Sequence, residues 1–371
     1  MVVMTKNIIS ILEKHFPLYL AEEWDNSGLQ IGSFNQNVNN ILIALDMDNT
    51  TLEKAITEQA DMIITHHPFF FKGIKSINVE NTQGKIIKEL INRNISLYTA
   101  HTNLDLADQG LNQALAELLE LEEIKPLNKA YIENLYKLVV FVPQTHINKV
   151  RKAVSEAGAG HIGNYSDCTF RTAGTGTFLP REGTNPFIGE KDKLEEVNEF
   201  KMETILPEKH IRNVLENMNK AHPYEEVAYD LYPLKNEGKI YSPGRKGILA
   251  NEIKLEEFAN MVKNKLNADH IRIIGDFEKV IKKVAVVSGS GASFINMAKS
   301  QRVDLLVTSD VKYHEAKNAQ EAGLAIIDAG HQYTEDIMVN YLKDLLSKEF
   351  LKNMFNVNIS TSFSARVFKY L

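Results

Sequence analysis

Short apolar segments alternate with helical patterns at both ends of the chain, and this alternation limits the folds that the sequence can adopt. Three apolar segments of strand-like length in the N-terminal third lie at 41–46, 62–65 and 95–100. Three more in the C-terminal third lie at 284–287, 304–308 and 325–328. Helical periodicity occurs between and after them, as at 51–60 and 334–346. This pattern is typical of βαβ units, so we expect an α/β fold at both ends.

The two ends of the chain also resemble each other. Asp-Met-Ile-Ile-Thr at 61–65 lines up with Asp-Leu-Leu-Val-Thr at 304–308. The next apolar segment of each end leads to a histidine with an acidic residue four positions later: His101 with Asp105, and His331 with Glu335. We interpret this as a degenerate duplication that gives two similar α/β lobes facing each other. Chance similarity between short apolar strands is the alternative.

The middle of the chain follows a different pattern. A strand that ends in a proline and precedes a helix occurs twice, at Pro143 and Pro207, and each proline suits the first turn of its helix. Two such units predict an inserted βαββαβ, ferredoxin-like α+β domain. We therefore divide the chain into an N-terminal lobe, the inserted domain and a C-terminal lobe, at 1–128, 129–240 and 241–371.

Composition narrows the classes of protein. The chain has 371 residues, of which 44% are hydrophobic, which is enough for two or three cores. Its net charge of −6 disfavours binding to nucleic acid or to an anionic membrane. The single cysteine, Cys168, excludes an intrachain disulfide, and the sequence shows neither a secretory leader nor an apolar run of roughly 18 residues. We expect a soluble cytoplasmic protein.

Adjacent histidines follow one of the apolar strands. His66 and His67 stand at its C-terminal end, where open α/β sheets usually bind ligands. Consecutive side chains there point to opposite sides, so the two imidazoles can serve different metal ions. A histidine pair that binds no ligand is the alternative.

The two histidine–acid pairs extend this set. A spacing of four residues places both side chains on one face of a helix, and each pair follows a strand end. Nitrogen and oxygen ligands together suit zinc first, with iron, manganese, cobalt and nickel as other candidates, and a carboxylate can bridge two ions. Structural salt bridges are the alternative. We predict a centre with two divalent metal ions, held by His66, His67, Asp105, His331 and Glu335.

These motifs together resemble the Nif-three-like family, whose bacterial members are known as homologues of GTP cyclohydrolase I, type two. The resemblance rests on segments at 24–30, 65–68, 101–105, 288–291 and 330–335. It implies a dinuclear metal centre and a toroidal homohexamer. By position, it implies His67 and Asp105 on one ion, His66 and His331 on the other, and Glu335 on both.

The resemblance also bears on the remaining parts. It places His101 near the centre, as a ligand or a proton carrier, and it likens the inserted domain to trimeric signalling proteins of the PII and CutA kind. It implies attack of metal hydroxide on the guanine imidazole ring of GTP, with His101 or His314 moving protons. A metal-dependent phosphoesterase is equally compatible with the predicted site. A non-enzymatic metal-binding or small-molecule-sensing hexamer is the competing class, and a DNA-associated regulator is disfavoured by the net charge.

Four other motifs remain, and the first two have two interpretations each. The Ser-Gly-Ser-Gly loop at 288–291 could bind phosphate through its backbone N–H groups, or it could be only a tight turn. His314 lies in a polar segment that could line the cleft or simply be solvated. Trp24 is expected to be a core anchor. The acidic segment after His222 is expected to serve turns and packing.

Overall fold

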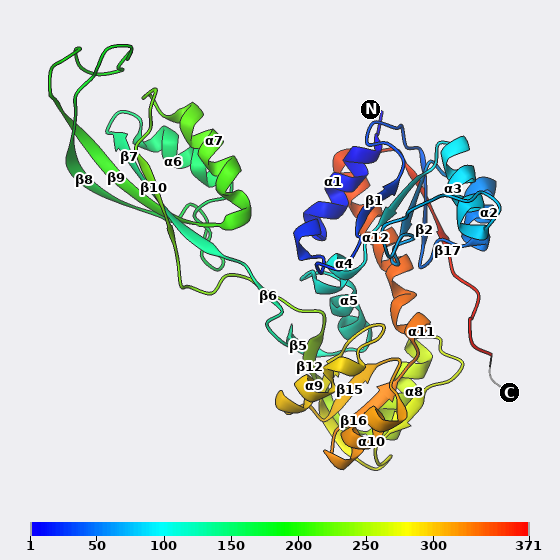
Figure 1. The fold of residues 1–371 in the computed structure, drawn as a ribbon. Helices are drawn as coiled ribbons and strands as arrows, with labels where there is room; N and C mark the ends of the chain where they lie inside the picture. The colour runs from blue at the N-terminus through cyan, green and yellow to red at the C-terminus, as the bar shows by residue number, and fades with distance from the viewer. Residues whose placement is uncertain (1, 370–371) are drawn as a thin grey trace. The chain divides into compact units, whose positions relative to one another are not determined.

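The computed structural model describes residues 2–369, and the chain forms two compact units (Figure 1). Unit 1 comprises Met1–Tyr131 and Tyr241–Leu371, and unit 2 comprises Ile132–Ile240. The chain passes from one unit to the other through two short paired strands, β6 (Tyr131–Ile132) and β11 (Ile240–Tyr241). Among the described residues, no helix is long and apolar enough to cross a membrane.

The first sheet of unit 1 has five strands in the order β1-β4-β3-β2-β17. Their bounds are Gly28–Ile31 for β1, Asn40–Ala44 for β2, Met62–Thr65 for β3, Ser96–Thr99 for β4 and Asn358–Ser362 for β17. Strands β17, β2, β3 and β4 run parallel, and β1 pairs antiparallel with β4. Parallel strands bring their C-terminal ends to one edge of the sheet.

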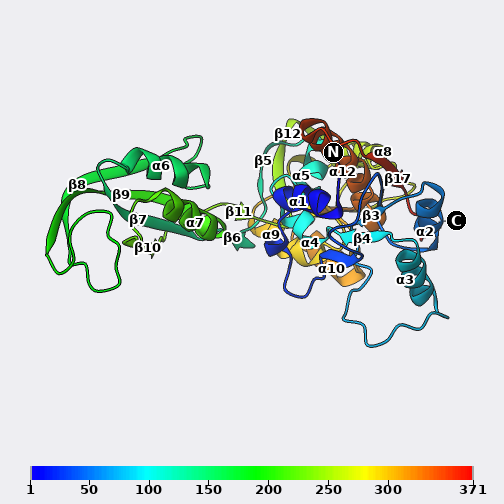
Figure 2. The ribbon, with the colours of Figure 1, turned by 90° about the horizontal axis from the view of Figure 1, so that it is seen from above.

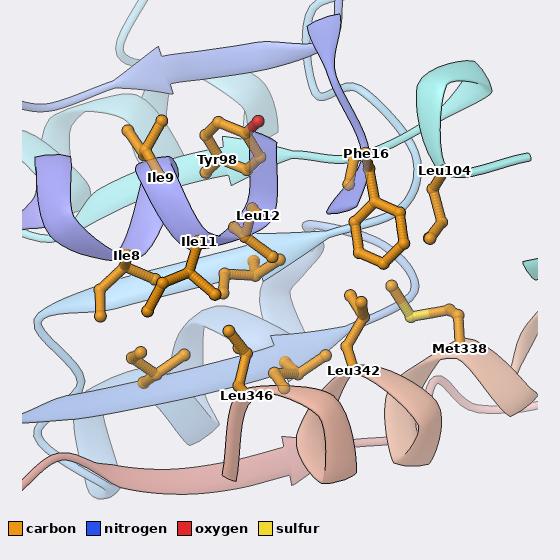
Figure 3. Close-up of a cluster of buried hydrophobic side chains, with 14 of the residues drawn as sticks. Ile8, Ile9, Ile11, Leu12, Phe16, Tyr98, Leu104, Met338, Leu342 and Leu346 are labelled. Carbon is orange, nitrogen blue, oxygen red and sulfur yellow. The ribbon is translucent and has the colours of Figure 1, made fainter. Parts of the chain in front are cut away.

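Helices cover both faces of this sheet. Helices α1 (Thr5–His15) and α12 (Ile337–Asn353) pack on one face, and Leu12, Leu342 and Leu346 lie between the two helices (Figure 3). Helices α2 (Asn49–Thr57) and α3 (Thr82–Asn92) lie side by side on the other face (Figure 2). Along β2, Ile41 and Ile43 belong to the first core whereas Leu42 belongs to the second, as the two-residue period of a strand requires.

The second sheet of unit 1 has six strands in the order β13-β16-β15-β14-β12-β5. Their bounds are Glu122–Pro126 for β5, Arg245–Lys254 for β12, Arg272–Ile274 for β13, Val280–Val286 for β14, Leu305–Thr308 for β15 and Ala325–Asp328 for β16. The strands β14, β15 and β16 run parallel, and the other pairs are antiparallel. Helices α5 (Leu111–Leu118) and α8 (Leu255–Lys265) cover one face, and α9 (Ile295–Ser300) and α10 (Tyr313–Glu321) cover the other.

Two one-turn helices follow strands of unit 1 and lie next to its histidines in the sequence. Helix α4 (Thr102–Leu106) directly follows the loop after β4, and α11 (His331–Glu335) follows the loop after β16. In the described part of the chain, short 3₁₀ helices occur at Leu18–Leu20 and Ala292–Phe294 in unit 1 and at Glu208–His210 in unit 2. The expectation of a mixed α/β fold is confirmed.

Unit 2 contains one four-stranded sheet with two helices on one face. Its elements follow in the order β7 (Leu135–Pro143), α6 (Ile147–Glu156), β8 (Thr169–Phe178), β9 (Glu195–Pro207), α7 (Ile211–Ala221) and β10 (Tyr229–Pro233). The sheet order is β10-β7-β9-β8, and all neighbouring strands are antiparallel. Helices α6 and α7 pack together on a core that includes Val140, Val150, Met202 and Val214.

The prediction that the two prolines lie in the first turn of a helix is wrong. Pro143 is the last residue of β7, and Pro207 is the last residue of β9. The helices begin four residues later, at Ile147 and Ile211. A 3₁₀ turn, Glu208–His210, fills the interval in the second case. Proline ends a strand as readily as it begins a helix, because its ring fixes φ and removes the N–H that a ladder needs.

Candidate metal centre

Four histidines gather at the C-terminal ends of parallel strands in unit 1. His66 and His67 follow β3, His101 follows β4, and His331 follows β16. The ring centroid of His67 lies 5.2 Å from that of His66, 5.8 Å from that of His101 and 5.5 Å from that of His331. Sequence positions from 66 to 331 therefore converge on one cluster, which includes every histidine predicted for the metal centre.

The carboxylates reach the cluster from the two one-turn helices. The Oε2 atom of Glu335 lies 3.0 Å from Nε2 of His67 and 3.0 Å from Nε2 of His331. The Oε1 atom of Glu335 lies 3.7 Å from Nε2 of His66. Nε2 of His66 is also 3.7 Å from Oδ1 of Asp105. The carboxylate of Glu335 thus stands between two groups of side chains.

These contacts pair the histidines and carboxylates differently from the two ligand sets that the family resemblance implies. The structure places His66 with Asp105, and His67 with His331. The resemblance implies the opposite assignment of the two neighbouring histidines. Sequence shows that consecutive side chains diverge, but not which one faces which lobe.

Each histidine is held by a partner at its Nδ1 atom. The carboxylates of Asp46, Asp25 and Asp310 lie 2.8, 2.8 and 2.7 Å from Nδ1 of His67, His101 and His331, respectively. Nδ1 of His66 lies 2.8 Å from the carbonyl oxygen of Ala100. Such partners are typical of metal-binding histidines, because a donor bond at one nitrogen fixes the ring and leaves the other nitrogen as a ligand.

Two of these orienting residues were missed in the sequence. Asp46 ends the apolar segment 41–46, and Asp25 lies in the segment 24–30, to which no site role was assigned. Asp25 also accepts hydrogen bonds from Ser27 and Thr102, which together with His101 hold the pKa of its carboxyl group well below its usual range, although burial opposes this. The sequence signal that could have identified them is an aspartate beside the end of a strand, where that strand neighbours one that ends in a histidine.

Buried polar atoms in the cluster have unmet bonding capacity. His66 is fully buried, and no hydrogen bond from the described residues reaches its Nε2 atom. Glu335 is also buried, and its Oε2 atom faces two imidazole nitrogens without a well-directed hydrogen bond. Buried polar atoms in native proteins are nearly always satisfied. Nitrogen and carboxylate oxygen atoms in this arrangement fit a metal ion, and two groups could hold one: His66 with His67 and His101, and His67 with His331 and Glu335.

The charges of the cluster also favour a bound cation. Burial opposes protonation of His67, but Asp46 and Glu335 raise its pKa to about 10. Burial likewise opposes protonation of His331, whereas Glu335 and Asp310 raise its pKa to about 9. The carboxylates therefore attract positive charge to the imidazoles, as protons or as metal ions.

Comparison with known proteins agrees with the motifs. Residues 3–365 match the family model described as Duf34/NIF3 (NGG1p interacting factor 3). The chain belongs to this family. A Duf34/NIF3 relative from Halalkalibacterium halodurans, named "GTP cyclohydrolase 1 type 2 homolog", is 43% identical over 357 residues, which is 96% of each chain. A Bacillus subtilis protein of the same name is 42% identical over 96% of this chain and 95% of its own.

Solved structures confirm the Duf34/NIF3 fold. A Bacillus cereus protein related to NIF3 superposes with a TM-score of 0.94, at 42% identity and over the full length of both chains. Staphylococcus aureus protein SA1388 superposes with a TM-score of 0.81, at 30% identity, over 100% of this chain and 99% of its own. The resemblance to this family that was drawn from sequence is confirmed.

In this Duf34/NIF3 chain, a cavity of about 740 Å³ opens onto the cluster. Trp24 and Phe71 line it beside His101, and their rings stack at 6.3 Å with an interplanar angle of 13°. Trp24 is 60% exposed, so the expectation of a core anchor is wrong. The indole meets the imidazole of His101 in a T-shaped contact at 5.9 Å.

The Ser-Gly-Ser-Gly loop lines the same cavity, and its first two N–H groups donate to side chains inside the protein. Ser288 N donates to Oδ1 of Asn112, and Gly289 N donates to Oγ1 of Thr334. Gly289 has a φ of +59°, and a Cβ atom there would lie 2.1 Å from Oε1 of Glu335. These contacts favour the tight-turn interpretation, in which glycine allows Glu335 to approach the backbone.

The remaining predicted residue lies apart from the cluster. His314 is exposed in the first turn of α10, and its ring contacts Tyr313. It is absent from the lining of both cavities next to the histidines. The structure therefore brings together six of the seven predicted site residues, namely His66, His67, His101, Asp105, His331 and Glu335.

Proposed function

We propose that this protein is a hydrolase that depends on two divalent metal ions held at the cluster. The observation that carries the proposal is the arrangement of four imidazoles, each fixed at Nδ1, around the carboxylate of Glu335. His66 and Asp105 would hold one ion with Oε1 of Glu335, and His67 and His331 would hold the other with Oε2. Two ions that share a carboxylate supply Lewis-acid activation of water and of a substrate oxygen.

The role of His101 follows from its surroundings. Its Nδ1 atom is occupied by Asp25, and the ring lies against Trp24 and Phe71 in the cavity. The Nε2 atom is therefore the one left to exchange a proton with a bound substrate, or to complete the ligands of an ion. We propose the first role, because His66 and His67 already lie closer to the shared carboxylate.

A nucleotide is the proposed substrate class. The exposed rings of Trp24 and Phe71 beside His101 suit stacking against a flat heterocycle. A second cavity, of about 590 Å³, shares His67 and His331 with the first and is lined by Arg272 and Arg366. Each guanidinium pairs with an aspartate through one nitrogen, and its remaining N–H groups suit phosphate oxygens. The curated relatives carry the name of a GTP cyclohydrolase homologue, so ring opening of GTP with formate release is the first reaction to test.

The architecture supports further proposals about organisation. In each sheet of unit 1, three adjacent strands run parallel and an antiparallel strand lies beside the third, as β2-β3-β4-β1 and as β14-β15-β16-β13. We propose that these are the two related lobes. The order β10-β7-β9-β8 with two helices on one face is that of a ferredoxin-like domain, and we propose this fold, with a PII-like role, for unit 2. A cytoplasmic homohexamer remains the predicted assembly.

The decisive experiment combines metal analysis with a turnover screen. Protein purified without added metal is expected to contain about two equivalents of a divalent metal and to release formate from GTP. Glu335→Gln is expected to lose the metal and the activity, whereas Glu257→Gln, an exposed position on α8, should keep both.

Each other outcome selects an alternative. Phosphate release without formate would identify a phosphoesterase. Full metal content without turnover of any nucleotide would favour a metal-binding or sensing assembly. Substoichiometric metal that Glu335→Gln does not change would contradict the dinuclear centre itself.

A further inference from the structure

Unit 2 contains a cavity of about 430 Å³ that is separate from the metal centre and lies on the face of the sheet away from α6 and α7. Phe141 and Glu199 line it, and they alternate along their strands with Val140 and Phe200, which face the helices. The long connection between β8 and β9 and the segment after α7 form the other walls. The volume lies in the range of roughly 300–1,000 Å³ that is usual for small-molecule sites.

Aromatic rings form much of the wall. Phe178 meets Tyr224 edge to face at 5.9 Å, and Phe187 lies 6.4 Å from the same tyrosine. Phe141 adds a fourth ring from β7. The faces of such rings carry negative partial charge and attract ammonium and guanidinium groups.

A buried carboxylate points into this cavity. Glu199 is only 8% exposed, and its Oε1 atom accepts a hydrogen bond of 2.8 Å from the Tyr224 hydroxyl group. Within residues 2–369, no hydrogen bond reaches its Oε2 atom. A Cβ atom at Gly176 would lie 2.3 Å from Oε2, so the absence of a side chain at Gly176 allows this oxygen to lie against β8. A carboxylate oxygen that lacks a donor suits a cationic one.

All charged side chains that line this cavity are acidic. Glu225 and Glu226 accompany Glu199, and the lining includes no lysine or arginine. Both carboxylate oxygens of Glu225 accept from the backbone N–H of Asn185, which fastens the β8–β9 connection to the segment after α7. Neither of the two groups that could hold a metal ion among the described residues includes a residue of unit 2. Apolar rings around one buried carboxylate suit an organic cation better than a metal ion.

We propose that unit 2 binds an organic ammonium ion with an apolar body. The ammonium N–H donates to Oε2 of Glu199, and the apolar body lies among the rings of Phe178, Phe187 and Tyr224. The motif after His222, which sequence assigned to turns and packing, thereby supplies a ring and two carboxylates to a ligand site.

Calorimetric titration of the full chain with two matched probes tests this assignment. 2-Phenylethylammonium and 2-phenylethanol share the ring and the chain but differ in charge. The ammonium is expected to bind at least about tenfold more tightly, because only it brings a positive charge to the carboxylate of Glu199 and to the aromatic rings. Glu199→Gln keeps the shape and removes the charge, so it should abolish this preference, whereas Glu196→Gln, exposed on the same strand, should preserve it.

A second variant keeps the test decisive should Glu199→Gln not fold. Phe187 is 52% exposed, so Phe187→Ala should fold and should weaken binding of both probes severalfold. Equal affinity for the two probes, a preference that survives Glu199→Gln, or no saturable ammonium binding at millimolar concentration would each overturn the proposal. Binding of Zn²⁺ that depends on Glu199, without ammonium binding, would overturn it in favour of an inorganic cation site.

Discussion

The Oδ2 atom of Asp310 lies 2.7 Å from Nδ1 of His331, while Nε2 of the same imidazole lies 3.0 Å from Glu335. The carboxylate of Asp310 therefore orients the imidazole of His331, and the Nε2 atom of that imidazole faces Glu335 in the candidate metal centre. Asp310 has a φ of +57°, a conformation that aspartate and asparagine tolerate better than most residues. Substitution by asparagine thus tests the carboxylate without disturbing the backbone.

Asp310→Asn is expected to weaken metal binding by about 10- to 100-fold, because the imidazole loses both its fixed orientation and some of its basicity. Competition with a chromogenic chelator measures the affinity. Asp344→Asn, at an exposed position of α12, is the matched control and should leave the affinity unchanged. Equal affinities in both variants would mean that Asp310 does not support a metal ligand.

Gly289→Ala is expected to displace Glu335 and to lower metal affinity at least about tenfold, since an added Cβ atom would lie 2.1 Å from Oε1. Gly323→Ala is the matched control, because Gly323 also has a positive φ, of +74°, but no atom lies within 4 Å of its added Cβ. Both variants should lose about 1–3 kcal/mol of unfolding free energy from backbone strain. Only Gly289→Ala should lose metal, and comparable metal content in the two proteins would contradict the proposed role of this close approach.

Arg245→Lys should destabilise unit 1 by about 2–4 kcal/mol, because one ammonium group cannot replace a guanidinium that donates to four carbonyl oxygens. Arg245 is buried on β12 and donates to the carbonyls of Ser242, Gly244, Ala107 and Asp108. The last two directly follow the helix that carries Asp105.

Urea unfolding followed by the fluorescence of the single tryptophan, Trp24, reports on unit 1 and measures this effect. Arg93→Lys, an exposed arginine that pairs with Glu89 one helical turn away, should change the free energy by less than about 0.5 kcal/mol. A similar small effect for Arg245→Lys would show that the carbonyls find other donors.

The sequence predicted the histidine cluster because parallel strands end at a common edge. This accounts for His66 and His101, which follow neighbouring strands of one sheet. His331 follows a strand of the other sheet, so its place in the cluster depended on the interpretation that the two lobes face each other. Glu335 could be placed in the same way, one helical turn after His331.

Features that depend on which strands are neighbours could not be predicted in this way. Asp25 and Asp46 orient histidines that lie more than twenty positions away, and their role appears only when β1, β2, β3 and β4 are assembled. The exposure of Trp24 could not be predicted either, because the sequence around a tryptophan does not show whether its ring is buried in a core or lines a cavity. The buried Glu199 was missed because a single acidic residue in a polar strand pattern gives no sign of burial.

Tyr98 provides a pH-dependent test of the core that supports the cluster. Its ring is fully buried on β4, and no hydrogen bond from the described residues reaches its hydroxyl group. Burial, together with the charge of Glu13, raises the pKa of Tyr98 well above its ordinary value. The folded state therefore holds this proton more tightly than the unfolded state, so the stability linked to it is complete below about pH 10 and is lost as the pH rises toward the folded pKa.

Above about pH 10, the free energy of unfolding should consequently fall less steeply with pH in Tyr98→Phe. The difference in slope should be about 1.4 kcal/mol per pH unit, which is the contribution of one titrating group. At about pH 8 the substitution should be neutral or stabilising by about 1 kcal/mol, since it removes a buried hydroxyl group that has no partner. Urea unfolding at a series of pH values, followed by Trp24 fluorescence, measures both effects. Tyr313→Phe, an exposed position in the same unit, should reproduce neither effect. A marked loss of stability at pH 8 in Tyr98→Phe would show that the hydroxyl group forms a stabilising bond, and the raised pKa would then need another cause.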